Sequence, residues 1–509
     1  MTKRYLLLPL VVMTIMATLI GCNKSSDEID DDGAYTTETM YSSTAITSFN
    51  LKANSKVLDS LDKVFFTIDL VNARIFNADS LPYGTKISKL LTNISTTSSS
   101  KIEIIMKGDG VQKDSTITYT STSTDSIDFN RDVIVRVTSL NETYKRDYDI
   151  DVNVHKVKAD SMTWSSLSWT SMPEELKNQK TVEFNGKVYT FMTTDDNKHK
   201  VWIQPTPGAT GSISDIEFGF SPDLRSLAVS DQGFYILSED GDMYSSDDSQ
   251  HWTPTGENWH HIYGAYTSYI IGVKEVDGTY FHVTYPATTS AEVVADCPIE
   301  GTSALVTFDS KWNETPQVTF VGGKKADGTL SDAAWSFDGN SWAKISDQPI
   351  GTELENAILF TYFSYRANSK VSWKVTKYST LFAVGGRKSN GSLNNVVYIS
   401  RDLGINWKKA DDLLQLPEFV SPGMNADAVV ASTTAYSRSD NSLAWNEVAS
   451  HRLPWWWTIE EVPASRATAP ITSWECPYVY IYGGENASGV HYNHIWRGII
   501  NRLLFKPLQ

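Results

Sequence analysis

The stretch YISRDLGINW, residues 398–407, contains Ser400, Asp402, Gly404 and Trp407 in the spacing S-x-D-x-G-x-x-W. A serine and a carboxylate at such short range could belong to an active site or could close a turn. Related residues precede three further tryptophans: Ser245 and Asp247 before Trp252, Asp338 before Trp342, and Asp440 before Trp445. Recurrence favours the turn, in which the aspartate accepts backbone N–H bonds, the glycine adopts a strained dihedral angle and the tryptophan packs beneath. We therefore expect these residues to be structural.

Patterns typical of catalysis and metal binding do not occur elsewhere in the sequence. H-E-x-x-H, G-x-S-x-G and phosphate-loop motifs are missing, as are closely spaced metal ligands, so we expect no cofactor and no metal. Carboxylates such as Glu460, Glu461 and Glu475 could still pair for general acid–base hydrolysis. A carbohydrate-active hydrolase or lyase therefore stays open as the alternative to a non-catalytic binding protein.

Two aromatic segments are candidates for ligand binding. In RLPWWW, an extended chain turns at least one of three consecutive tryptophans away from the core, and a flat exposed indole can stack on a sugar ring or anchor a partner. NWHHIYGAYTSY also concentrates aromatic side chains. Core packing is the alternative for both segments. The candidate residues are Arg452, Trp455, Trp456 and Trp457 in the first segment and Trp259, His260 and His261 in the second.

Two regions with different patterns must position these residues. Residues 44–157 contain no tryptophan, and runs such as KIEIIM and DVIVRVTS have the period of two that predicts the half-buried strands of an antiparallel sandwich. Residues 158–509 contain all 16 tryptophans and repeated glycine turns between apolar runs, which predict a repeat of hairpins. The turns are Asn185-Gly186, Asp240-Gly241, Asp277-Gly278, Asp327-Gly328, Asn390-Gly391 and Ser488-Gly489.

The motifs of the second region resemble those of β-propellers. The S-x-D-x-G-x-x-W spacing is similar to the Asp-box of sialidases, and VTFVGG, LFAVGG and YIYGG, which end at Gly323, Gly386 and Gly484, are similar to the diglycine of kelch repeats. The resemblance implies an all-β fold with radial blades of four strands. We expect six or seven blades, with seven preferred, and we expect the opening stretch LSWTSMPEE to complete the last blade.

The resemblance to propeller enzymes fails at their catalytic residues. A sialidase would need an R-I-P-like motif in its first blade, whereas the similar phrase Arg452-Leu453-Pro454 stands near the end of the chain. Galactose oxidase shares the kelch pattern, but its copper site needs a tyrosine cross-linked to a cysteine and paired histidines, a setting that Cys297 and Cys476 lack. These two cysteines form either one disulfide or two free thiols.

The start of the chain resembles a bacterial lipoprotein signal. Lys3 and Arg4 precede an apolar run that ends in Leu19-Ile20-Gly21-Cys22, so we expect removal of residues 1–21 and lipidation of Cys22. The acidic run NKSSDEIDDD begins a flexible tether, residues 22–43. Because this run is similar to the surface-export signal of Bacteroidetes lipoproteins, we expect exposure on the outer membrane, with a periplasm-facing lipoprotein as the alternative.

Charge and domain order narrow the expected function. The formal charge of −16 becomes −18 when Lys3 and Arg4 leave with the signal, which argues against a nucleic-acid partner. The phrase VIVRVTSLNETYKRDYDIDVNV resembles the terminal hairpin of bacterial Ig-like domains, so residues 44–157 are expected to form an Ig-like sandwich before a kelch/Asp-box propeller at 158–509. This order resembles a family of Bacteroidetes surface lipoproteins. We expect a monomeric, non-catalytic binding or scaffold module that presents a propeller face to a glycan or protein ligand.

Overall fold

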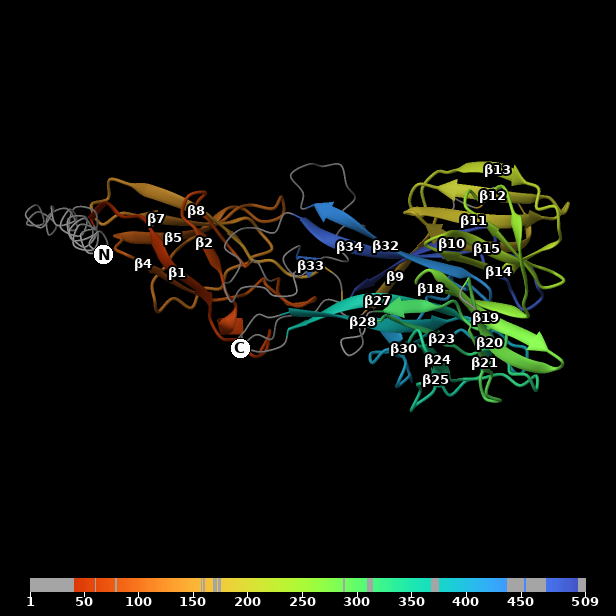
Figure 1. The fold of residues 1–509 in the computed structure, drawn as a ribbon. Helices are drawn as coiled ribbons and strands as arrows, with labels where there is room; N and C mark the ends of the chain where they lie inside the picture. The colour runs from red at the N-terminus through yellow and green to blue at the C-terminus, as the bar shows by residue number, and fades with distance from the viewer. Residues whose placement is uncertain are drawn as a thin grey trace, which may run out of the picture. The chain divides into compact units, whose positions relative to one another are not determined.

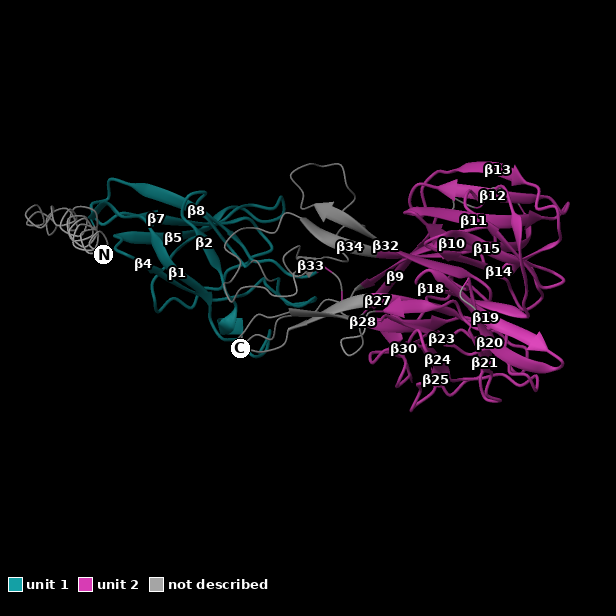
Figure 2. Ribbon diagram, in the orientation of Figure 1, with its two compact units in different colours: residues 1–155, 466–470, 507–509 teal, residues 156–465, 471–506 magenta. Residues whose placement is uncertain are grey.

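The computed structural model describes residues 41–501, except 60, 78–79, 157, 159–160, 168–171, 173–174, 287–288, 309–314, 368–374, 437–452 and 455–472 (Figure 1). The described residues divide into two compact units, with the boundary between His155 and Lys156 (Figure 2). Both units consist of β-sheets, which confirms the all-β prediction. Among the described residues, no helix has the length and apolarity needed to span a membrane.

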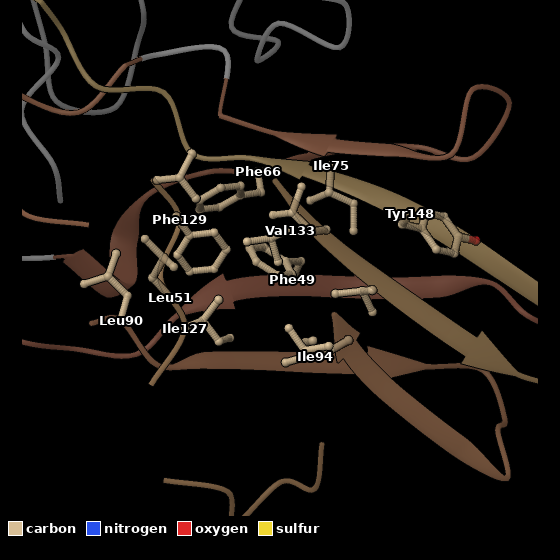
Figure 3. Close-up of a cluster of buried hydrophobic side chains, with 14 of the residues drawn as sticks. Phe49, Leu51, Phe66, Ile75, Leu90, Ile94, Ile127, Phe129, Val133 and Tyr148 are labelled. Atoms are coloured by element: carbon tan, nitrogen blue, oxygen red, sulfur yellow. The ribbon is translucent and has the colours of Figure 1, made fainter. Parts of the chain in front are cut away.

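The N-terminal unit has two sheets around one apolar core. The core contains Phe49 from one sheet and Val133 and Tyr148 from the other, and Phe49 meets Phe66 edge to face at 4.9 Å between ring centroids (Figure 3). The small sheet pairs β1 (Ile46–Leu51) with β4 (Thr92–Thr96). The large sheet has the order β2 (Thr67–Asp69), β3 (Arg74–Phe76), β8 (Lys145–Asp151), β7 (Val133–Thr138), β5 (Lys101–Met106) and β6 (Ser115–Thr118).

One strand pairing in this unit differs from the prediction of an antiparallel sandwich. Strand β3 pairs with β8 in parallel, with Arg74, Ile75 and Phe76 opposite Asp149, Ile150 and Asp151. The alternation of apolar residues identifies half-buried strands, but it carries no information on the direction of the neighbouring strand. In a parallel pair the chain must return to the end of the sheet at which the first strand begins. Here the chain that contains β4 to β7 makes this return between β3 and β8.

The C-terminal unit contains six antiparallel sheets with a four-strand path in the part of the chain that the structure describes. The preference for seven blades is therefore not met by these residues. In chain order the sheets are β10 (Leu176–Phe184), β11 (Lys187–Thr194), β12 (His199–Gln204), β13 (Ser212–Ile216); β14 (Pro222–Ser230), β15 (Gly233–Ser238), β16 (Asp242–Ser246), β17 (Thr253–Asn258); β18 (His261–Tyr266), β19 (Tyr269–Val276), β20 (Thr279–Tyr285), β21 (Ser290–Glu292); β22 (Val306–Phe308), β23 (Gln317–Val321), β24 (Ala334–Phe337), β25 (Trp342–Lys344); β27 (Ile358–Ala367), β28 (Val375–Val384), β30 (Tyr398–Ser400), β31 (Lys408–Lys409); and β32 (Asp427–Tyr436), β34 (Ser473–Tyr482), β35 (Ile495–Asn501), β9 (Ser161–Ser166). We call them the first to the sixth sheet.

The first strands of the sheets form the inner wall of a ring. Strand β10 contacts both β14 and β32, β14 contacts β18, and β27 contacts β22 and β32, so the first and sixth sheets are neighbours. The sixth sheet takes its outer strand from the start of the region, because β9 pairs with β35. The predicted closure by the opening stretch is thus observed, although the strand is SMTWSS, residues 161–166, directly before the stretch we named.

The glycine turns occupy a common position in five sheets. Asp240-Gly241, Asp277-Gly278, Asp327-Gly328, Asn390-Gly391 and Ser488-Gly489 each lie between the second and third strands. Asn185-Gly186 instead joins the first and second strands of its sheet, where Asn185 has φ +49° and Gly186 φ +73°. A tight turn suits any antiparallel pair, so the residue pair alone does not reveal which strands it joins.

Candidate functional site

The turn at residues 400–407 is held together by its own side chains. One carboxylate oxygen of Asp402 accepts hydrogen bonds from the Ser400 hydroxyl at 2.8 Å and from the Asn406 backbone N–H at 2.9 Å, and the other accepts from the Asn406 amide at 2.7 Å. Gly404 has φ +104°, and its carbonyl accepts from the Trp407 indole at 3.0 Å. Burial disfavours the charged form of Asp402, but the bonds from Asn406 and Ser400 outweigh it and hold the pKa below its usual value.

The turn before Trp252 corrects our assignment of its carboxylate. Asp247 and Asp248 are both exposed, and it is Asp248 whose oxygen accepts the backbone N–H groups of Gln250 and His251, both at 2.8 Å. The Asp338 carboxylate accepts from Asn340 and Ser341 in the same way, both at 2.9 Å. These two turns are one residue shorter than the turn at Asp402, so counting back five residues from Trp252 selects the wrong aspartate. Ser245 lies outside the turn, with its hydroxyl 3.5 Å from that of Thr253.

Each described tryptophan of these turns packs against the sheet that precedes its own. The ring centroid of Trp252 lies 6.2 Å from that of Phe191 in the first sheet, and that of Trp342 lies 5.1 Å from that of Tyr263 in the third sheet. Trp407 joins an apolar cluster that includes Val321 of the fourth sheet. These contacts link neighbouring sheets, as expected of structural residues. Asp440 and Trp445 lie outside the described residues.

Three consecutive sheets carry the same hairpin after their second strand. In each hairpin the residue after the diglycine forms a backbone bridge across it, in the pairs Lys324 with Leu330, Arg387 with Leu393 and Glu485 with His491. The first glycine of each pair has φ between +60° and +65°, and at Gly385 an added Cβ atom would lie 2.2 Å from the Gly423 carbonyl oxygen. Backbone crowding therefore requires glycine at the base of these hairpins.

In each of these sheets, the residue after the diglycine lies beside the segment that leads into the first, inner strand. Lys324 pairs with Glu300 at 2.8 Å, and Arg387 pairs with Glu355 at 2.5 Å. In the sixth sheet the charge is reversed, because Glu485 occupies the basic position. Its carboxylate accepts from the Asn425 amide at 2.5 Å and lies 3.1 Å from the His491 ring.

Backbone hydrogen bonds connect the segments that precede the inner strands of neighbouring sheets. Asn356 donates its N–H to the Gly301 carbonyl at 2.7 Å, and Asn425 donates to the Asn356 carbonyl at 3.2 Å. Asn425 and Asn356 have φ +60° and +52°, and Gly301 has φ +61°. The three positions are therefore equivalent in consecutive sheets, and they define what we call the axial end of the propeller, the end at which the inner strands begin.

The first, second and sixth sheets meet at this axial end. Asp427 accepts from the Lys180 ammonium group at 2.7 Å and from the Thr181 N–H at 2.7 Å, both on β10. Arg225 of β14 donates to the carbonyl of Asn425 at 2.6 Å. Strand β10 lies between β14 and β32 in the ring, so this side chain reaches past a whole sheet across the interior.

The described aromatic candidates have different environments. Trp259 is buried in the core, and its indole donates to Glu257 at 3.1 Å, so it is a packing residue. His260 lies 3.4 Å from Glu300 at the axial end. His261 begins β18, keeps some solvent-accessible surface, and has a pKa that burial lowers to about 4, so its ring is neutral at pH 7.

The remaining candidates are partly beyond the described chain. Cys22, Arg452, Trp455, Trp456, Trp457, Glu460 and Glu461 lie outside the described residues. Cys297 is a buried free thiol, so it does not form the alternative disulfide. Among the described residues, no group of three or more His, Cys, Asp or Glu side chains could hold a metal ion.

Sequence reasoning missed most of the axial side chains. The sequence carried a signal for three of them, because Lys324, Arg387 and Glu485 each directly follow a diglycine that we singled out. Arg225 and Asp427 had none, because neither lies in a motif that we singled out. Only the closed ring brings the two together.

The fold and the repeated turns place the chain among β-propeller proteins. The chain belongs to the DUF6242 family: residues 158–508 match the DUF6242 beta propeller domain, and residues 35–152 match the DUF6242 N-terminal domain. A search of curated proteins finds no match to the chain.

Several solved structures resemble part of the chain. YjhT has 13% identity and a TM-score of 0.37, with 64% of this chain and 95% of that one covered. SapL1 lectin in complex with alpha methyl fucoside has 12% identity and a TM-score of 0.31, with 52% and 87% covered. The fucose-specific lectin from Aleuria aurantia has 12% identity and a TM-score of 0.28, with 50% and 86% covered. At TM-scores below 0.5 these similarities support no functional argument.

Proposed function

We propose that the protein is a lipid-anchored surface protein whose propeller binds a glycan at its axial end without catalysing a reaction. The observation that carries this proposal is the state of four axial carboxylates. Glu300 and Glu355 pair with basic side chains, Asp427 pairs with Lys180, and Glu485 accepts from an amide. Such fixed groups suit hydrogen bonding to a hydroxyl-rich ligand, whereas acid–base catalysis needs a carboxyl group whose protonation changes during the reaction.

A glycan array probed with the chain from residue 23 onward tests the binding. The variant Lys324→Ala/Arg387→Ala removes two axial cations, and we expect it to lose signal on the glycans that the wild type binds. The matched control Lys101→Ala/Arg136→Ala removes two cations from similarly exposed ion pairs of the N-terminal unit and should bind as the wild type does. Equal signals for all three proteins would refute an axial site.

The aromatic segment gives the same array a second comparison. If the glycan instead stacks on the consecutive tryptophans, Trp455→Ala/Trp456→Ala/Trp457→Ala will lose binding while the axial variant retains it. That outcome would keep glycan binding and move its site. Release of reducing sugar from a bound glycan would refute the non-catalytic role and favour the hydrolase alternative.

The membrane anchor is supported by the lipoprotein-like start of the chain. More than one acyl chain on Cys22 would give durable anchoring, because each buried methylene contributes about 0.8 kcal/mol. We expect Cys22→Ser to move the protein from the membrane fraction to the soluble fraction. Protease digestion of intact cells then separates surface exposure, which predicts cleavage, from the periplasm-facing alternative, which predicts protection.

A further inference from the structure

Arg225 is a cation near the axis without a carboxylate of its own. Its Nη1 atom donates to the Asn425 carbonyl at 2.6 Å, and its Nη2 atom is buried without a hydrogen-bond partner among the described residues. Asp427 and Glu485 act on it only at longer range and have partners of their own. Asp223 accepts the backbone N–H of Arg225 at 3.0 Å and does not form an ion pair with the guanidinium group within the described residues.

The buried Arg131 shows how a structural arginine is satisfied in the same chain. Its Nε and Nη2 atoms donate to the carbonyls of Lys107, Met106 and Lys113 at 2.7 to 3.0 Å. Its Nη1 atom donates to the Gln112 side chain at 3.2 Å. Every nitrogen of this guanidinium group is engaged, whereas the buried Nη2 of Arg225 is not.

An enclosed charge with an unused donor is costly unless something supplies the missing acceptor. Burial lowers the pKa of Arg225, and Asp427, Glu485 and Asp223 oppose this effect from a distance. A buried polar group without a partner destabilises the folded state, because it has lost its hydrogen bonds to water. Water or a ligand must therefore satisfy Nη2 in solution.

We infer that Arg225 binds the carboxylate of an acidic sugar, which makes the ligand of the propeller an acidic glycan. This inference rests on the proposed glycan-binding function. A carboxylate supplies both the negative charge and the acceptor that Nη2 lacks, and the planar guanidinium fork matches its geometry. The neutral His261 begins the adjacent inner strand and adds no second positive charge.

Calorimetric titration with D-glucuronate and D-glucose tests the inference, because the two sugars differ in the carboxylate. We expect the chain from residue 23 onward to prefer glucuronate, and we expect Arg225→Met to weaken glucuronate binding at least about tenfold. Arg225→Lys keeps the charge without the fork and should be intermediate. Arg131→Met is the matched control and should bind glucuronate as the wild type does.

Thermal unfolding, followed by tryptophan fluorescence, separates a binding role from a structural one. Without ligand, Arg225→Met should unfold at the wild-type temperature or above it, because it removes a charge that lacks a counterion. A large drop in the unfolding temperature of Arg225→Met would overturn the inference and make Arg225 a structural tie.

The binding results distinguish failure of the inference from failure of the proposed function. Array binding of glycans with no dependence on Arg225 would overturn the inference and leave the function. Glucuronate binding that depends on Arg225, without binding of any glycan on the array, would retain the carboxylate site and overturn the function. Absence of both would overturn both, and equal binding of inorganic sulfate and glucuronate would overturn the assignment to a carboxylate.

Discussion

Neighbouring aspartates at residues 247 and 248 have opposite roles at the residue scale. Both side chains are exposed, but it is the Asp248 carboxylate that closes the turn through two backbone N–H groups and also contacts the His251 ring at 2.6 Å. We expect Asp248→Ala to lower the stability of the propeller by about 1 kcal/mol, the usual cost of losing such a side-chain cap. Asp247→Ala should leave it unchanged. Urea unfolding followed by tryptophan fluorescence makes the comparison, and equal effects of the two substitutions would contradict the turn assignment.

Asp402 also predicts a pH dependence. Because its folded pKa is lowered, its ionised form stabilises the fold above the unfolded pKa of about 3.9, and this contribution is lost as the pH falls through the lower folded pKa. The stability difference between wild type and Asp402→Asn should therefore be full at pH 7 and shrink below about pH 4. Thermal unfolding at several pH values measures it. A difference that persists to pH 2 would show that the charge of Asp402 is not responsible.

The turn residues show where prediction from sequence succeeds and where it fails. Asp402 was identified correctly because its serine, glycine and tryptophan fix one register. Asp247 was chosen over Asp248 because two adjacent aspartates satisfy the same pattern, and only the number of residues in the turn decides between them. Local chemistry can be predicted from local sequence, but the length of a turn depends on the strands that it joins.

Among the structural elements, the diglycine hairpins contain glycines that differ in how closely the backbone surrounds them. Gly322 and Gly328 both have positive φ, at +65° and +83°, but a Cβ atom on Gly322 would lie 2.3 Å from the Leu354 carbonyl oxygen, whereas one on Gly328 would meet open space. We expect Gly328→Ala to cost about 1 kcal/mol through backbone strain alone, and Gly322→Ala to cost about 3 kcal/mol or more because backbone must also move. Urea unfolding measures both, and equal costs would contradict the crowding at the hairpin base.

Each sheet could be predicted as an element, but the meeting of Arg225 with the sixth sheet at the axial end could not. Glycine turns and apolar runs reveal hairpins because the signals lie within a few residues of one another. Arg225 and Asn425 are 200 residues apart and meet only because β14 and β32 flank β10. The sequence predicted six or seven sheets, with seven preferred, and the described residues form six. The variable length of the loops between strands hides the number of repeats.

At the scale of the whole molecule, stability of the propeller depends on closing the ring with β9. Trp164 of this strand is buried in the core that joins the fifth and sixth sheets, and it covers Gly498, where a Cβ atom would lie 2.5 Å from the indole. The strand is separated by more than 300 residues from its partner β35, so its packing joins the two ends of the region. Loss of the indole should therefore weaken all six sheets together.

We expect Trp164→Ala to destabilise the propeller by about 3–5 kcal/mol, the usual cost of removing a buried tryptophan side chain. Because all 16 tryptophans lie in residues 158–509, tryptophan fluorescence reports on this unit alone. Phe49→Ala, in the core of the N-terminal unit, is the control and should leave the fluorescence transition in place. If Trp164→Ala instead frees only the sixth sheet, the fluorescence transition will split into two steps, and the ring does not unfold cooperatively. In urea unfolding followed by tryptophan fluorescence, a single transition at a lower urea concentration is the result expected for a ring that β9 closes.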